Sequence, residues 1–121
     1  MNERYFFDTY AIVEIIKGNK DYEPYIDSTK VIKNFILAKL SYVLLRDKYP
    51  NAEKYLEKYK RFIQSVKHEW IEEAMEFRLK WKDRKVSITD CVGYVMAKKF
   101  GVKFLTGDKE FEGLNNVEFV K

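Results

Sequence analysis

The sequence has few of the residues on which disulfide-bonded or zinc-binding domains depend. Its 121 residues include one cysteine, Cys91, and one histidine, His68. A single cysteine cannot form an internal disulfide, and these two residues cannot build a Cys/His zinc site, so we expect a reducing compartment. No apolar run approaches the ~20 residues of a membrane span, and Asp8 and Glu14 interrupt the N-terminal apolar stretch, unlike a signal peptide. We therefore expect a cytoplasmic protein with no membrane association.

Charges of one sign also do not gather into a block. The net charge is +4, and charged residues make up 35% of the chain. Because the basic residues are spread among acidic ones, the charge is compatible with a polyanionic partner but does not identify one. The length suits one domain over residues 1–121, with a core that needs no disulfide or structural metal.

The apolar pattern predicts strands alternating with helices. In chain order we expect a strand over 4–8, a helix closed by residues 18–19, a loop or short helix over 21–30, helices over about 31–49 and 52–65, a possible short strand over 66–68, helices over 69–82 and 87–101, and strands over 102–107 and 117–120. Such alternation predicts a three-layer α/β/α sandwich around a short, mostly parallel sheet.

Three aspartates stand where an apolar, strand-like run gives way to a turn or helix start. They are Asp8 in FFDTY, Asp90 in SITDC and Asp108 in FLTGD. Carboxylates at the C-terminal ends of parallel strands would line one crevice, where they repel each other unless a cation joins them. Magnesium takes a few carboxylates and keeps positions open for a phosphate oxygen. The pattern therefore favours metal-assisted phosphodiester chemistry.

Each aspartate also has a purely structural explanation. Asp8 is a good N-cap for the helix that follows it, Ser87 to Asp90 reads as a capping box, and Asp108 can cap a short turn. Taken singly, each acid is more often a cap than a catalytic group. Together they favour a site, because three caps would fall on three strand ends only by chance.

Three segments resemble the PIN domains, most closely the VapC toxins of type II toxin–antitoxin pairs: YFFDTYAIVEII, SITDCVGYVMAKKFGVKFLTGDKEF and NVEFVK. The resemblance implies an α/β/α fold, a magnesium- or manganese-dependent endoribonuclease acting on RNA, a cognate antitoxin that inhibits it, and a homodimer. It implies that Asp8, Asp90 and Asp108 are the metal-binding, catalytic acids. Thr9, Ser87 and Thr106 would be nearby hydroxyls able to bind water or an acid.

One position departs from the family pattern. The resemblance implies a glutamate in a stretch like LAEL on the second long helix, and this chain has Lys39 there, in ILAKLSYVLL. Helical spacing places Lys39 among apolar residues such as Phe35 and Tyr42, where a charge is costly without a partner. Either the lysine reaches solvent past its neighbours, or its ammonium points into the aspartate crevice, which we favour. There it would compete with magnesium and weaken activity.

Other readings are weaker. Basic and aromatic residues between positions 52 and 67 could contact RNA, although a solvated helix face is the more common explanation. Further acids that could assist the site are Glu14, Asp27, Glu110 and Glu112. The chain does not fit a response-regulator receiver domain, because it has no mid-chain phosphoacceptor on a third strand and no acidic pair after the first strand. The main rival is a PIN-like module without catalysis that binds an antitoxin or RNA, because Lys39 disables the metal site.

Overall fold

The computed structural model describes residues 3–121, apart from the side chains of residues 29, 31 and 34. The strands of this part of the chain form one sheet in the order β2-β1-β3-β4, and every neighbouring pair is parallel. Their bounds are β1 Arg4–Phe7, β2 Thr29–Val31, β3 Lys103–Thr106 and β4 Val117–Phe119. The fully parallel sheet confirms the predicted fold class, and it directs the carboxyl ends of all its strands to the same edge.

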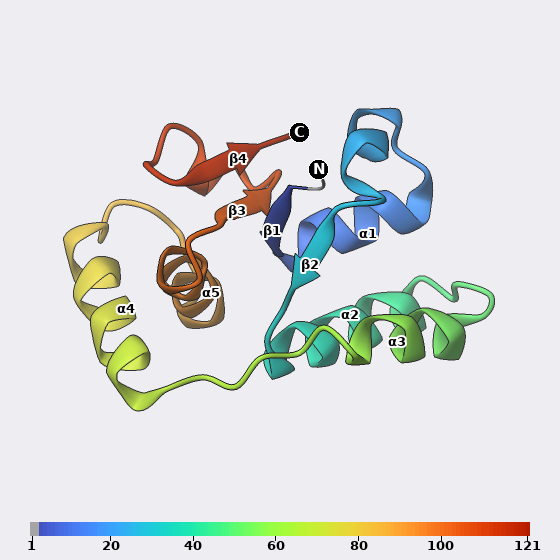
Figure 1. The fold of residues 1–121 in the computed structure, drawn as a ribbon, viewed down its shortest axis with the longest axis horizontal. Helices are drawn as coiled ribbons and strands as arrows, with labels where there is room; N and C mark the ends of the chain where they lie inside the picture. Colours follow the sequence, from blue (N-terminus) through green and yellow to red (C-terminus); the bar gives the residue numbers. More distant parts are fainter. Residues whose placement is uncertain (1–2) are drawn as a thin grey trace.

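Helices cover both faces of the sheet, which gives the three predicted layers (Figure 1). They are α1 Thr9–Lys17, α2 Asn34–Arg46, α3 Ala52–Lys60, α4 His68–Lys80 and α5 Ile88–Lys99, with short 3-10 helices η1 Lys20–Tyr25 and η2 Lys109–Phe111. One face carries α5 backed by α4, and the other carries α1 with α2 and α3 outside it. Each face therefore has its own buried cluster.

Alternation along β1 divides the core between these two clusters. Phe6 points to the α5 side, where it packs with Phe104, whereas Tyr5 and Phe7 point to the α1 side. Side chains of successive strand residues point to opposite faces, so a run such as YFF contributes to both clusters at once. This is the continuous apolar run expected of a parallel strand buried on both faces.

The structure differs from the prediction in the elements between residues 21 and 68. The segment over 21–30 contains η1 but also β2, and the helix predicted from about residue 31 begins at Asn34. The helix predicted to residue 65 ends at Lys60, and the described residues 66 and 67 form no strand. A three-residue strand is too short to show alternation, so only its pairing with β1 reveals it. Residues 62–64 instead pair with Ile32 just beyond β2.

None of the described helices is both long enough and apolar enough to cross a membrane.

Candidate functional site

Asp8 stands between β1 and α1 and is almost fully buried. Its carboxylate caps α1 by accepting a hydrogen bond from the Thr9 backbone N–H, 2.7 Å from Oδ1. Its other oxygen, Oδ2, accepts a hydrogen bond of 2.7 Å from the hydroxyl of Thr106, the last residue of β3. The neighbouring strand thus fixes the orientation of this acid. Thr106 is one of the three hydroxyls that the resemblance placed near the acids.

Asp90 is the third residue of α5 and does not end a strand, so the expectation of three acids on three strand ends was wrong for this residue. Ser87 caps the helix, and its Oγ accepts a hydrogen bond from the Asp90 backbone N–H at 3.0 Å. The packing of α5 against β1 and β3 carries the first turn of the helix to the carboxyl edge of the sheet. The first turn of α5, and not the end of a strand, therefore positions Asp90 at the site.

Asp108 follows β3 by two residues. Its backbone N–H donates to the Thr106 hydroxyl at 3.0 Å, and its Oδ1 accepts from the Glu110 backbone N–H at 3.0 Å. Gly107 lies between them, and a Cβ at this position would collide with the Tyr10 ring and with the backbone oxygen of Val120. The glycine therefore lets the chain pass close to α1 and keeps Asp108 beside the site.

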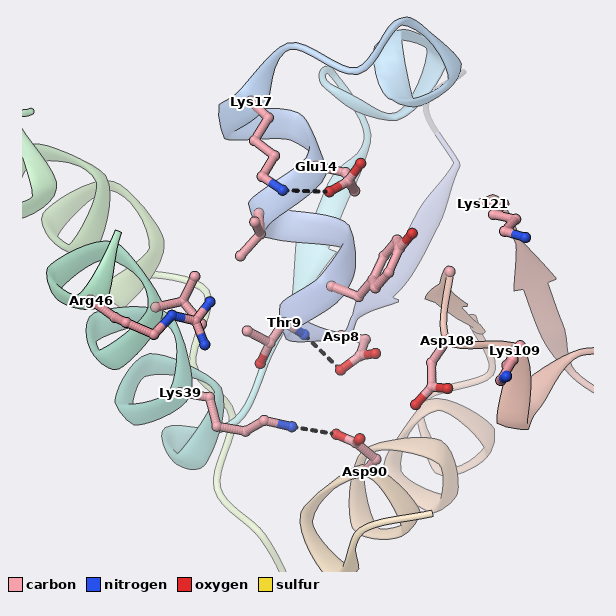
Figure 2. Close-up of a pocket in the computed structure, with 14 residues that line it drawn as sticks. Asp8, Thr9, Glu14, Lys17, Lys39, Arg46, Asp90, Asp108, Lys109 and Lys121 are labelled. Atoms are coloured by element: carbon pink, nitrogen blue, oxygen red, sulfur yellow. Dashed lines mark hydrogen bonds and ion pairs between the residues drawn. The ribbon is translucent and has the colours of Figure 1, made fainter. Parts of the chain in front are cut away.

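The three aspartates line one open cleft of about 550 Å³ (Figure 2). Figure 2 shows Asp8, Asp90 and Asp108 directed toward a common space, with Lys39 reaching in from α2. The same cleft is lined by one further acid and four further cations: Glu14, Lys17, Arg46, Lys109 and Lys121. The cations of this cleft suit an anionic ligand, because they attract it toward the group of acids.

Lys39 forms an ion pair with Asp90, with 2.9 Å between Nζ and Oδ1. Of the two expectations for this side chain, the structure has the ammonium in the crevice. The expected apolar surroundings were partly wrong, because Phe35 and Tyr42 are each 65% exposed. Attraction to the Asp90 carboxylate, and not burial among apolar neighbours, therefore accounts for the direction of the Lys39 side chain.

The surroundings of Asp8 favour its protonated form over the charged carboxylate. Burial raises its pKa to about 7, and the nearby charge of Asp90 adds to the rise. The Thr106 hydrogen bond, the Lys39 charge and the Thr9 N–H oppose the shift only in part. Two carboxylates confined together in a buried site bind a shared proton or a cation to relieve their repulsion.

Lys33 is a buried cation that the sequence prediction missed. It stands at the N-cap of α2, its side chain is fully buried, and its Nζ has no hydrogen-bond partner among the described residues. Burial lowers its pKa to about 8, while the negative charges of Asp90 and Asp8 act to raise it and Lys39 acts to lower it. The only sequence signal was a lysine directly after the apolar pair Val31 and Ile32, at a strand-to-helix junction.

Several weaker candidates lie outside the acid cluster. Glu14 lines the cleft but is held by Lys17 at 3.6 Å and by the Asn19 side-chain amide at 2.9 Å. Glu110 accepts a hydrogen bond from the Lys85 backbone and does not line the cleft. Cys91, next to Asp90 in the sequence, is a buried free thiol. Among the aromatic residues between positions 52 and 67, Tyr59 is buried and is not available to stack on an RNA base, whereas Tyr55 and Phe62 are half-buried.

The donor chemistry of the crevice suits a hard divalent cation. Asp8 and Asp90 supply carboxylate oxygens, and the raised pKa of Asp8 is the mark of a buried acid that lacks positive charge. Within residues 3–121, however, no three acidic, histidine or cysteine side chains are close enough to share one ion. Asp8 and Asp90 would hold the cation, Asp108 would approach it, and Lys39 occupies one oxygen of Asp90.

The chain is similar to known proteins both in sequence and in fold. The PIN domain family matches residues 5–116. Among solved structures, a toxin–antitoxin complex from Klebsiella pneumoniae contains a chain with a TM-score of 0.77 and 15% identity, over 94% of this chain and 95% of the other. No curated protein matches the sequence.

Two further solved structures have the same fold. VapC20 from Mycobacterium tuberculosis, described as a toxin that cleaves the sarcin–ricin loop, has a TM-score of 0.72 and 17% identity over 94% of this chain and 98% of its own. A VapBC2 structure from Rickettsia felis, bound to a DNA fragment of its promoter, has a TM-score of 0.71 and 19% identity, with 97% of each chain covered. The three likenesses extend over nearly the whole of each chain.

Proposed function

Because the chain belongs to the PIN domain family, we propose that it is a magnesium- or manganese-dependent endoribonuclease and the toxin of a type II toxin–antitoxin pair, attenuated by Lys39. The observation that carries this proposal is the gathering of Asp8, Asp90 and Asp108 around one cleft. The toxin–antitoxin proteins among the similar structures support a partner of the antitoxin class, and a homodimer is part of the same proposal.

The residues in and beside the cleft have three roles in this proposal. Asp8 and Asp90 are the ligands of the cation, and Thr106 orients Asp8 through its 2.7 Å hydrogen bond. Lys109 and Lys121 line the cleft and attract the phosphate backbone of RNA. A divalent ion, when bound, would supply Lewis-acid chemistry and a more acidic water at the phosphodiester.

Lys39 attenuates this activity through its charge. Its ammonium holds Asp90 Oδ1 at 2.9 Å, so an incoming cation must displace it or bind without that oxygen. A protonated lysine cannot ligate a metal, and at a few ångströms and an effective dielectric near 20 two unit charges interact by roughly 3–4 kcal/mol. The lysine therefore opposes metal binding in the position where the family pattern has an acid.

A second candidate function is a module that binds an antitoxin or RNA without catalysis. The observation that favours it is the same Lys39–Asp90 ion pair, which neutralises one of the two buried acids with no metal. The two candidates differ in what they predict for the chain with Lys39 in place. The first predicts weak, manganese-dependent RNA cleavage, whereas the second predicts no cleavage.

The deciding experiment compares the natural chain with Lys39→Glu in manganese titration calorimetry and in a gel assay on mixed RNA. We expect metal affinity and cleavage to rise together by at least about tenfold, because the exchange removes a competing cation and adds a ligand. Lys54→Glu is the matched control, since it makes the same charge change at an exposed position of α3. Equal affinity and equal cleavage in the natural chain and Lys39→Glu would contradict the attenuation by Lys39.

A second variant tests the acids themselves. In the Lys39→Glu background, Asp8→Asn should reduce RNA cleavage by about a hundredfold or more while the chain stays folded, because asparagine is a weak ligand but a good N-cap. Circular dichroism checks the fold. Full activity of the double variant would show that Asp8 is only a cap.

A further inference from the structure

We propose that Lys33 is a second internal counter-charge of the aspartate crevice, acting from beneath it to lower the affinity of the site for a divalent cation. The inference rests on the proposed metal site and adds a residue outside the cleft lining. Lys39 approaches the acids from the open side of the cleft, with 39% of its side chain exposed. Lys33 is fully buried and is not part of the cleft wall.

The path of the Lys33 side chain is fixed by its neighbours on α5. A Cβ at Gly93 would lie 3.5 Å from Lys33 Cε and 3.1 Å from the rings of Phe6 and Phe104. The lysine stem therefore passes along the surface of α5 where the helix has no side chain. Gly93 is three residues after Asp90, so both lie on the same face of the helix. The absent side chain at Gly93 gives the stem room beside α5, about one turn along the helix from Asp90.

Apart from the acids, the Lys33 ammonium has one weak interaction among the described residues, with the Phe35 ring centred 5.7 Å from Nζ. Its Nζ has no hydrogen-bond partner there. A buried ammonium without a partner is costly, and the negative charges of Asp90 and Asp8 are the ones that favour its charged form. The interaction is reciprocal, so the Lys33 ammonium also lowers the affinity of the aspartates for a divalent metal ion.

Another buried lysine of the same segment shows what a structural role looks like. Lys30, in β2, donates hydrogen bonds to the backbone oxygens of Ile26 at 2.6 Å and Ser28 at 3.1 Å. Its Nζ lies 5.2 Å from the centre of the Phe7 ring, on the α1 side of the sheet. Lys30 is thus satisfied by local carbonyls, whereas Lys33 on the α5 side depends on the acids of the site.

The pair of lysines provides a matched test. In the Lys39→Glu background, manganese affinity is measured by calorimetry for Lys33→Met and for Lys30→Met. The pH lies between about 7 and 8, above the pKa of Asp8 and below that of Lys33, so that the aspartates and the Lys33 ammonium are charged together. Methionine keeps most of the stem and removes the charge. We expect Lys33→Met to tighten manganese binding by about tenfold, because one unit charge near the ion is removed in a medium of low dielectric. Lys30→Met should leave the affinity within about twofold.

The outcomes separate this inference from the proposed function. Unchanged manganese affinity in folded Lys33→Met would overturn the inference and leave the metal site standing. An equal gain in Lys30→Met would overturn it as well, since the effect would not be specific to the crevice. No manganese binding by Lys39→Glu itself would overturn the proposed metal site and the inference with it. Should Lys33→Met not fold, Lys33→Gln takes its place. Failure of both to fold, with Lys30→Met folded, would assign Lys33 a structural role and overturn the inference.

Discussion

Helix α5 takes part in two neighbouring regions that are stabilised in different ways. Tyr94 packs against aromatic rings on both sides, 5.2 Å from Trp81 and 6.1 Å from Phe104 between ring centres. One turn earlier, Asp90 forms an ion pair with Lys39 and lies within the electrostatic reach of Asp8 and of the buried Lys33. The aromatic region gains from every contact it makes, whereas the crevice confines charges that would be better solvated in the unfolded chain.

The difference separates stability from function along one helix. Aromatic packing depends little on pH or on a bound ion, because it comes from apolar burial and ring contacts. The energy of the crevice depends on the protonation of Asp8, on the two lysines and on any cation that enters. A change in the first region should therefore alter stability alone, and a change in the second should alter stability, metal affinity and activity together.

The largest expected effect is in the aromatic region. Phe104→Ala removes a buried ring that contacts Phe6 and Phe111, and we expect it to lower the free energy of unfolding by about 3–5 kcal/mol. Urea denaturation at two pH values measures the loss, which should be the same at both. The exposed Leu79→Ala in α4 is the control and should change stability by less than about 0.5 kcal/mol. A loss confined to one pH would contradict the separation of the two regions.

The next effect is the pH dependence of the crevice. The folded pKa of Asp8, about 7, lies above its unfolded value of 3.8. Between these values the folded chain holds a proton that the unfolded chain has lost, so the free energy of unfolding falls as pH rises from about 4 to 7. This acid should therefore lower stability above pH 7 by on the order of 2–4 kcal/mol relative to pH 4.

Asp8→Asn measures that contribution directly. The variant carries no titrating group at this position, so we expect it to be more stable than the natural chain at mildly alkaline pH and to lose the decline between pH 4 and 7. Thermal unfolding across this range gives the comparison. Asp27→Asn, at an exposed position, should leave the profile unchanged. An identical pH profile for Asp8→Asn would show that another group is responsible.

A smaller effect is expected from metal addition. In Lys39→Glu, manganese at about a hundred times its dissociation constant should add roughly 2.7 kcal/mol to the free energy of unfolding. The natural chain should gain less at the same concentration, because Lys39 holds Asp90. A chelator should reverse the gain. Equal stabilisation of the two chains would place the ion elsewhere in the molecule.

The smallest effect links the two regions through the start of α5. Ser87→Ala removes the side-chain oxygen that accepts the Asp90 backbone N–H at 3.0 Å, and we expect a loss of about 1 kcal/mol. In the Lys39→Glu background, manganese binding should weaken as well, since the cap helps to fix Asp90. Ser65→Ala, at an exposed position outside any helix, is the control. Loss of stability with unchanged metal affinity would make Ser87 a cap only.

Local patterns were sufficient for much of the fold. The apolar run before Asp8 predicted β1, helical periodicity predicted α4, the Ser87 start and Gly101 end predicted α5, and VKFLTG predicted β3. These elements have strong internal signals because their periodicity follows from which faces are buried. The three-residue β2 has no such signal, since pairing with β1 alone makes it a strand. The segment that carries Lys33 was misread for this reason.

The sequence by itself determined which residues could form a site: three aspartates at the starts of helices or turns, and a lysine where the family pattern has a glutamate. Only the tertiary structure decided how their charges interact. The parallel sheet and α5 bring Asp8 within the field of Asp90, and the same packing buries Lys33 within reach of their charges. The physical reason is that capping depends on nearest neighbours in the chain, whereas burial and the pairing of charges depend on which distant segments exclude water together.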